Sequence, residues 1–423
     1  MPNTACVVWL TAIGCAIAAG AGAGQSSEAT QLARFREKVR QDMTGIPNYT
    51  CLETVDRAHR DPHHRSFKAI DTVRLEVSSV GGKELVAWPG ARRFGDQDAT
   101  TMVTGGAIGT GMFALFAQKL FVTGAGTLQY GGAENLAGRA SVRYDFHVTR
   151  QDSGFRITAS GASEAVAAKG SFWFDTNSLD LIRLDVYGDA MPYSLRLEEA
   201  VFRTSYSRTR IGEADALLPR QSELTMTHFS GEASRNAIKF SNCHEYQSQS
   251  TISFAAPPAS VPETPKAQVR EVNLPAGVLV PVELDMAIDS KTASVGDTLR
   301  GHVAAEVRYQ NDLLLPQGAA IAGHIRQLSR RSSRAPAVVG LEFSEVEWPG
   351  AHAAFYAELV DLYANSAGSH HPVTYFNGHA MQVLIEGGLP GVGVFYLDAA
   401  GFHIPSGFHM VWRTLAGSGR IVE

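Results

Sequence analysis

The chain has 423 residues, of which 44% are hydrophobic and 19% are charged, and its formal net charge at pH 7 is −5. This length and composition predict a folded protein of two domains, with ample apolar material for burial. The negative charge argues against a nucleic-acid-binding protein, whose binding domain would be basic.

The N-terminal segment has the features of a secretory signal. Residues 1–27 contain no charged side chain, and the apolar run 5–19 precedes small residues that offer A-x-A cleavage sites near 22–25. We therefore expect a signal peptide over 1–24 and export to the periplasm or cell envelope. Two alternatives remain open: an uncleaved membrane anchor, and lipidation at Cys15.

Removal of the signal leaves two cysteines, Cys51 and Cys243. In an exported chain, two cysteines predict one disulfide. Two buried free thiols are the alternative.

An amphipathic helix is predicted first, followed by strands. Leu32, Phe35, Val39 and Met43 recur at helical spacing over 28–43. Alternating apolar and polar residues then predict strands, and 170–189 read as a hairpin around the turn DTNS. We expect residues 25–254 to form a curved antiparallel half-barrel sheet with helices as a lid. The strand segments are 50–57, 71–80, 83–88, 141–148, 194–202, 222–229 and 237–246.

The stretch 104–121, TGGAIGTGMFALFAQKLF, begins like a glycine-rich loop. It lacks the Gly-Lys-Ser/Thr ending and the glycine spacing of phosphate-binding loops. From Thr110 onward it predicts a short helix with one apolar face, which is either a permanent part of the core or a mobile lid over a ligand. The candidate ligand-binding residues on that face are Met112, Phe113, Phe116, Leu120 and Phe121.

Prolines divide the chain. Residues 255–273 are rich in proline and small polar residues and predict an extended linker. Short strands with Pro-Gly and Gln-Gly turns follow, so residues 274–423 predict a small β-barrel domain.

The order of elements over 28–254 resembles that of the periplasmic lipoprotein-carrier (LolA-like) superfamily. The match rests on the N-terminal helix, the succession of antiparallel strands and the hairpin GSFWFDTNSLDLIRLDV. The resemblance implies an incomplete barrel around a hydrophobic cavity with a helical lid, and an acyl chain or another apolar segment as the ligand.

Residues 274–363 resemble the barrel of TrbI-like conjugation and type IV secretion proteins, which implies a related barrel in the cell envelope. The overall layout resembles that of exported bacterial two-domain proteins. The matching features are 274–277, Pro281, Ser290, Gly296, 315–318 and Gly323.

No catalytic motif is found in the sequence. It has no G-x-S-x-G elbow, and His244-Glu245 does not begin an H-E-x-x-H zinc motif. Two histidine sets lie in polar loops, where we expect solvated side chains, so no metal and no cofactor is predicted. These sets are His59, His63 and His64, and His370, His371 and His379.

Four arginines cluster within 326–334. They would suit contact with a membrane surface or a polysaccharide, and a solvated basic loop is the alternative.

The sequence thus favours a non-enzymatic, exported envelope protein that binds a hydrophobic ligand and docks through its C-terminal barrel. The alternative is a structural or assembly component of an envelope complex, with protein partners and no small ligand. A third hypothesis is a hydrolase whose catalytic groups come from distant strands. Ligand identity and oligomeric state stay open.

Overall fold

Strands dominate this chain. The computed structural model describes residues 21–81, 83–91, 94, 102, 116–246, 270–329, 336–363, 373–376, 379–384, 390–398 and 401–416. Within these ranges the strands form two large sheets with few helices. The predicted mainly-β fold is therefore confirmed. The expected signal peptide and linker lie largely outside the described residues.

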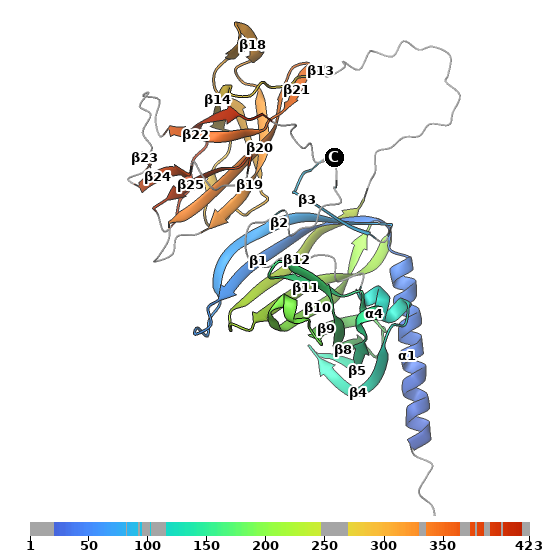
Figure 1. The fold of residues 1–423 in the computed structure, drawn as a ribbon. Coiled ribbons are helices and arrows are strands. Elements are labelled where there is room, and N and C mark those ends of the chain that lie inside the picture. Colours follow the sequence, from blue (N-terminus) through green and yellow to red (C-terminus); the bar gives the residue numbers. More distant parts are fainter. Residues whose placement is uncertain are drawn as a thin grey trace, which may run out of the picture.

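The N-terminal sheet has 10 strands in the order β3-β2-β1-β12-β11-β10-β9-β8-β5-β4. Neighbouring strands are antiparallel. Strand β1, which is the first in the chain, pairs with β12, which is the last strand of this sheet in the sequence. Figure 1 shows the sheet curled into a half-barrel with α1 along one side. The strands are β1 (Tyr49–Arg60), β2 (Lys68–Val80), β3 (Lys83–Ala87), β4 (Thr127–Leu136), β5 (Arg139–Val148), β8 (Ala167–Asp175), β9 (Leu181–Asp189), β10 (Leu197–Ile211), β11 (Ala214–His228) and β12 (Ala233–Glu245).

Short elements connect or cover this sheet. They are α1 (Ala21–Thr44), η1 (Gln118–Val122), α4 (Arg150–Ser153), η2 (Tyr193–Leu195) and the hairpin of β6 (Arg156–Ala159) and β7 (Ala162–Ala165). Helix α1 begins earlier than the predicted 28–43. Its buried Phe35 and Val39 confirm the predicted apolar stripe. At its end, the amide of Gly45 donates to the carbonyl of Gln41.

The predicted hairpin over 170–189 is formed by β8 and β9. Asp175 ends β8, and its Oδ1 accepts hydrogen bonds from the amides of Asn177 and Ser178 at 2.8 and 2.9 Å. This side chain therefore replaces missing backbone partners in the turn, which is why an Asp-Thr-Asn-Ser sequence reverses the chain here.

The convex face of the half-barrel carries a ladder of ion pairs across neighbouring strands. Arg183 binds Asp185 at 2.7 Å on β9, and Arg203 on β10 lies 3.8 Å from the same carboxylate. Arg143 binds Asp145 at 2.9 Å on β5. Because alternate residues of a strand point to opposite faces, these ion pairs lie on the side away from the apolar core, where the partly exposed arginines cover the Asp185 carboxylate.

Replacing Asp185 with Asn is expected to lower the free energy of unfolding by about 1–2 kcal/mol, because the side chain is almost buried and serves two arginines. Urea denaturation would measure the change. Glu213→Gln is the control, since Glu213 pairs with Arg210 in full solvent and should contribute almost nothing. An equal effect in both variants would contradict the prediction.

The C-terminal sheet has 11 strands, with a main path β22-β27-β14-β16-β19-β20-β25-β24-β23. Strand β22, at one end of this path, contacts β25 and β24 near the other end, so the sheet curls toward a small barrel. The strands of this part are β13 (Arg270–Glu271), β14 (Leu279–Leu284), β15 (Ile288–Asp289), β16 (Thr298–Val303), β17 (Val307–Tyr309), β18 (Asp312–Leu315), β19 (Ala320–Ser329), β20 (Ala337–Trp348), β21 (Ala351–Ala354), β22 (Ala357–Tyr363), β23 (Val373–Phe376), β24 (His379–Leu384), β25 (Gly393–Leu397), β26 (His403–Ile404) and β27 (His409–Thr414).

The walls of this curled sheet meet at Gly393. A Cβ atom placed there would lie 2.4 Å from Leu359 Cβ and 2.6 Å from the ring of Trp412. Trp412 is fully buried and meets Phe343 edge-on, with ring centroids 5.3 Å apart. A glycine at this position therefore makes room for the largest side chain of the core.

The two sheets are joined directly, through the edge of β2. The amide of Arg74 donates to the carbonyl of Val295 at 2.8 Å, and the amide of Val295 donates to the carbonyl of Thr72 at 2.9 Å. Strand β3 pairs only with residues 76–80 of β2, so Val295 meets the part of the edge that β3 leaves open.

Side chains complete this interdomain joint. Arg74 binds Asp297 at 2.5 Å. The ring of Trp88 is stacked with His324, with centroids 6.0 Å apart, and Arg326 lies over the same ring at 5.0 Å. Burial lowers the pKa of His324, so this ring is a neutral partner for the indole.

Candidate functional site

The concave face of the half-barrel is the candidate site, and its β5–β8–β9 half is aromatic. Phe35 of α1 lies on Phe174 at 4.3 Å and on Phe172 at 5.5 Å between ring centroids. Phe121 of η1 meets Phe35 edge-on at 5.2 Å and Phe172 at 4.9 Å. Two helical elements and the sheet thus share one aromatic cluster.

The structure places three of the five predicted ligand-binding residues. Phe116, Leu120 and Phe121 are buried, and Phe116 packs on Phe146 and Phe155. Met112 and Phe113 lie outside the described residues. The predicted helix continues to Val122, and its last turn is the π-helix η1. These three side chains belong to the hydrophobic core, and their contact with a ligand stays a prediction.

Polar contacts hold α1 against the sheet at both ends of its buried stripe. The hydroxyl of Tyr144 donates to the carbonyl of Glu28 at 3.1 Å. Near the other end, Arg208 of β10 binds Asp42 at 2.7 Å and Asp180 at 2.6 Å. The two carboxylates raise the pKa of Arg208 above its already high value. We call Arg208, Asp42 and Asp180 the helix clamp.

The concave side of β1, β2 and β12 is different, because it contains buried charged and polar groups. Arg57 binds Asp71 through two hydrogen bonds, one of 2.6 Å, and both side chains are almost fully buried. Glu53 is fully buried, and neither of its carboxyl oxygens has a hydrogen-bond partner in the part of the chain that the structure describes. Burial, followed by the charge of Glu84, raises the pKa of Glu53 well above its usual value.

Sequence reasoning missed Glu53, Arg57 and the helix clamp. A signal for the first two was present, since Glu53 and Arg57 alternate with Cys51 and Val55 on one face of β1. The clamp had no such signal, because its partners are far apart in sequence.

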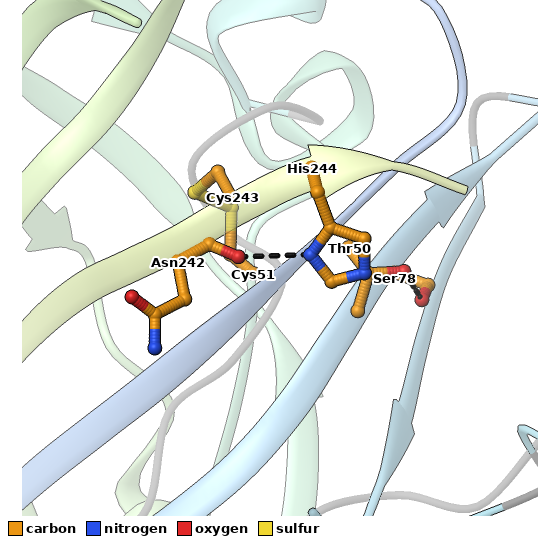
Figure 2. Close-up of a disulfide and its surroundings, with 6 residues drawn as sticks. All are labelled: Thr50, Cys51, Ser78, Asn242, Cys243 and His244. Atoms are coloured by element: carbon orange, nitrogen blue, oxygen red, sulfur yellow. Dashed lines mark hydrogen bonds between the residues drawn. A yellow bond between two sulfur atoms is a disulfide. The ribbon is translucent and has the colours of Figure 1, made fainter. Parts of the chain in front are cut away.

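The predicted disulfide lies at the rim of this face. Cys51 of β1 is joined to Cys243 of β12, and the sulfur bridge spans 192 residues of sequence. Figure 2 shows it beside Thr50 and Ser78, whose hydroxyl groups are 2.7 Å apart. The bridge is compatible with an oxidising compartment such as the periplasm.

A shallow groove of about 430 Å³ follows the side of α1. The exposed walls of this groove are mostly apolar, although five of its seven lining residues are charged or polar. Its lining residues are Thr30, Ala33, Arg34, Glu37, Lys38, Gln41 and Leu179.

Within the described residues, neither of the two histidine sets forms a metal site. His59 and His64 each lie within 4 Å of Asp61, at 3.7 and 3.6 Å. His370 and His371 lie outside the described residues. Across the described ranges, no group of three or more His, Cys, Asp or Glu side chains has an arrangement suited to a metal ion.

Among the described helices, none combines the length and the apolar character needed to cross a bilayer.

No protein-family model matches this sequence, and no curated protein is similar to it. The solved structures that are partly similar to this chain include the following two. One is a DUF1329 family protein from Desulfovibrio piger, with 10% identity, a TM-score of 0.29 and coverage of 52% of this chain and 92% of that chain. The other, from Vibrio parahaemolyticus, is described as an outer membrane lipoprotein-sorting protein domain, with 8% identity, a TM-score of 0.27 and coverage of 50% and 90%.

The LolA-like resemblance of residues 28–254 stays a prediction. The TrbI-like resemblance of residues 274–363 stays a prediction.

Proposed function

We propose that this protein is a non-enzymatic, exported envelope protein that binds an apolar ligand, such as an acyl chain, on the concave face of its half-barrel. In this proposal the C-terminal barrel serves for docking to an envelope partner.

The observation that carries the proposal is the way the concave face is covered. A single sheet places its apolar side chains on one side, and helical elements cover them where a sandwich would have a second sheet. Helix α1 is held at its margins by the helix clamp and by the Tyr144 hydrogen bond. Its buried stripe, Phe35 and Val39, is much smaller than the apolar face of a second sheet, so α1 can separate from the sheet at a smaller cost than a sheet-on-sheet interface.

The first test is direct. Protein freed of lipid should take up a fluorescent fatty acid, and mass spectrometry of purified protein should detect a copurifying acyl compound. If folded protein takes up no apolar probe, the proposal fails.

A variant tests whether α1 must move. Arg208→Ala removes the cation with the shortest contacts to Asp42 and Asp180 and leaves Lys38, which lies 3.2 Å from Asp42 and 3.8 Å from Asp180. Helix α1 should then open more often, and uptake should be about tenfold faster, as expected when roughly 1.4 kcal/mol of holding energy is lost. Stopped-flow fluorescence would measure the rate. Arg210→Ala is the matched control, because Arg210 lies on the same strand and pairs only with exposed groups. Equal uptake rates in both variants would contradict a moving α1.

One observation favours the second candidate, a structural component without a small ligand. The aromatic cluster is already closed, with Phe35, Phe172 and Phe174 fully buried against one another. In that case crosslinking in cells would capture protein partners while lipid extracts of the protein remain empty.

A further inference from the structure

The concave face contains one carboxyl group whose place the fold alone does not explain. Glu53 lies in the middle of β1 and is fully buried, and both of its carboxyl oxygens are unpaired within the described residues. Burying a polar group without a hydrogen bond is costly, so an apolar residue would be more stable here. A buried polar group that lowers the stability of the fold is a candidate for a role in ligand binding.

The side chain of Glu53 points to the concave side. Its cross-strand neighbours are Leu75 on β2 and Phe240 on β12, and both belong to the apolar core or pack against it. The next residue on the same face, Val55, is also in this core. Asp56 points the other way, is exposed and accepts a hydrogen bond from Thr72.

The surroundings of Glu53 favour its neutral form. Arg57, the cation on the same face of β1, is engaged through two hydrogen bonds by Asp71. Burial and the nearby Glu84 favour the protonated carboxyl. A protonated carboxyl has one O–H donor that is free to bind an acceptor.

We propose that Glu53 is the polar contact of the ligand site and donates its carboxyl O–H to the carbonyl oxygen of an acyl ligand. This inference rests on the proposed function and adds to it the chemical class of the ligand: a long hydrocarbon that carries one ester, amide or undissociated acid carbonyl. A plain hydrocarbon would leave Glu53 unpaired. A ligand with an amine would instead require the charged carboxylate form of Glu53.

Two pyrene-labelled probes of equal length test this inference: a long-chain methyl ester and the corresponding alkane. Wild-type protein should bind the ester about tenfold more tightly than the alkane, as one hydrogen bond allows. Glu53→Leu should lose this preference and keep its affinity for the alkane. Glu53→Gln should keep most of the preference, because the amide N–H can donate to the same carbonyl.

Asp56→Asn is the matched control, since it changes an acidic residue of the same strand on the opposite face, and it should bind both probes like the wild type. Equal binding of ester and alkane by wild-type protein overturns the role of Glu53 and leaves the proposed function standing. Loss of the preference in Glu53→Gln also overturns it, because the amide N–H can donate to the same carbonyl and a donor at this position would then not account for the preference. If neither probe binds, both proposals fall.

Thermal unfolding without ligand supplies an independent readout. If Glu53 serves the ligand and not the fold, Glu53→Leu should raise the unfolding midpoint, since it removes an unpaired polar group from an apolar site. A lowered midpoint or a failure to fold in both Glu53 variants assigns Glu53 a structural role and overturns the inference.

Discussion

Replacing both Cys51 and Cys243 with Ser is expected to lower the free energy of unfolding of the half-barrel by about 4–5 kcal/mol. The bridge spans 192 residues, and constraining so long a loop removes much conformational freedom from the unfolded chain. The bridge also joins β1 to β12, the first and the last strand of this sheet in the sequence. Without the bridge, these two strands must pair with no covalent link between them.

Urea denaturation followed by far-UV circular dichroism would measure this loss. Reduction of the wild-type protein should produce the same shift as the double variant, which separates loss of the bridge from effects of the serine side chains. If the midpoint of the unfolding transition is unchanged in both cases, the bridge does not stabilise the fold.

The second large effect is expected for Gly296→Ala, which should separate the two sheets. A Cβ atom at this position would lie 2.1 Å from the carbonyl oxygen of Arg74 and 2.9 Å from the ring of Trp88, and the backbone φ is +93°. Backbone cannot give way as a flexible side chain can, so Val295 would be pushed off the edge of β2. Small-angle X-ray scattering should then show a larger radius of gyration.

Gly318→Ala is the control for this experiment. Gly318 also has a positive φ, +82°, but a Cβ atom there meets nothing within 4 Å. That variant should lose about 1 kcal/mol from backbone strain and keep the joint. A wild-type scattering profile for Gly296→Ala would contradict the assigned role of the joint.

Local patterns in the sequence predicted much of the fold. Alternation in residues 141–148 predicted β5, and the DTNS turn predicted the β8–β9 hairpin, because each depends on residues close together in the chain. The aromatic stripe of Phe116, Leu120 and Phe121 was visible for the same reason. The apolar stripe of α1, which includes Phe35, was also predicted. Neither stripe indicated that Phe35 and Phe121 would be in contact.

The interdomain joint and the helix clamp could not be predicted in this way. The residues of each pair are far apart in the sequence. Arg74 meets Asp297, and Arg208 meets Asp42, only in the folded protein. Glu53 was overlooked for a different reason. A glutamate in an alternating strand is expected to face solvent, and here the alternation places it on the buried face.

The docking of Val295 on β2 also bears on solubility. The first half of β2 would otherwise present unpaired backbone groups along an open sheet edge, and such edges recruit strands from other molecules. Val295 therefore occupies backbone groups of Thr72 and Arg74 that a strand of another molecule would otherwise meet. A half-barrel produced alone, without residues 270–416, would leave the backbone groups of Thr72 and Arg74 without their partner Val295, so it should associate with itself more readily than the full chain.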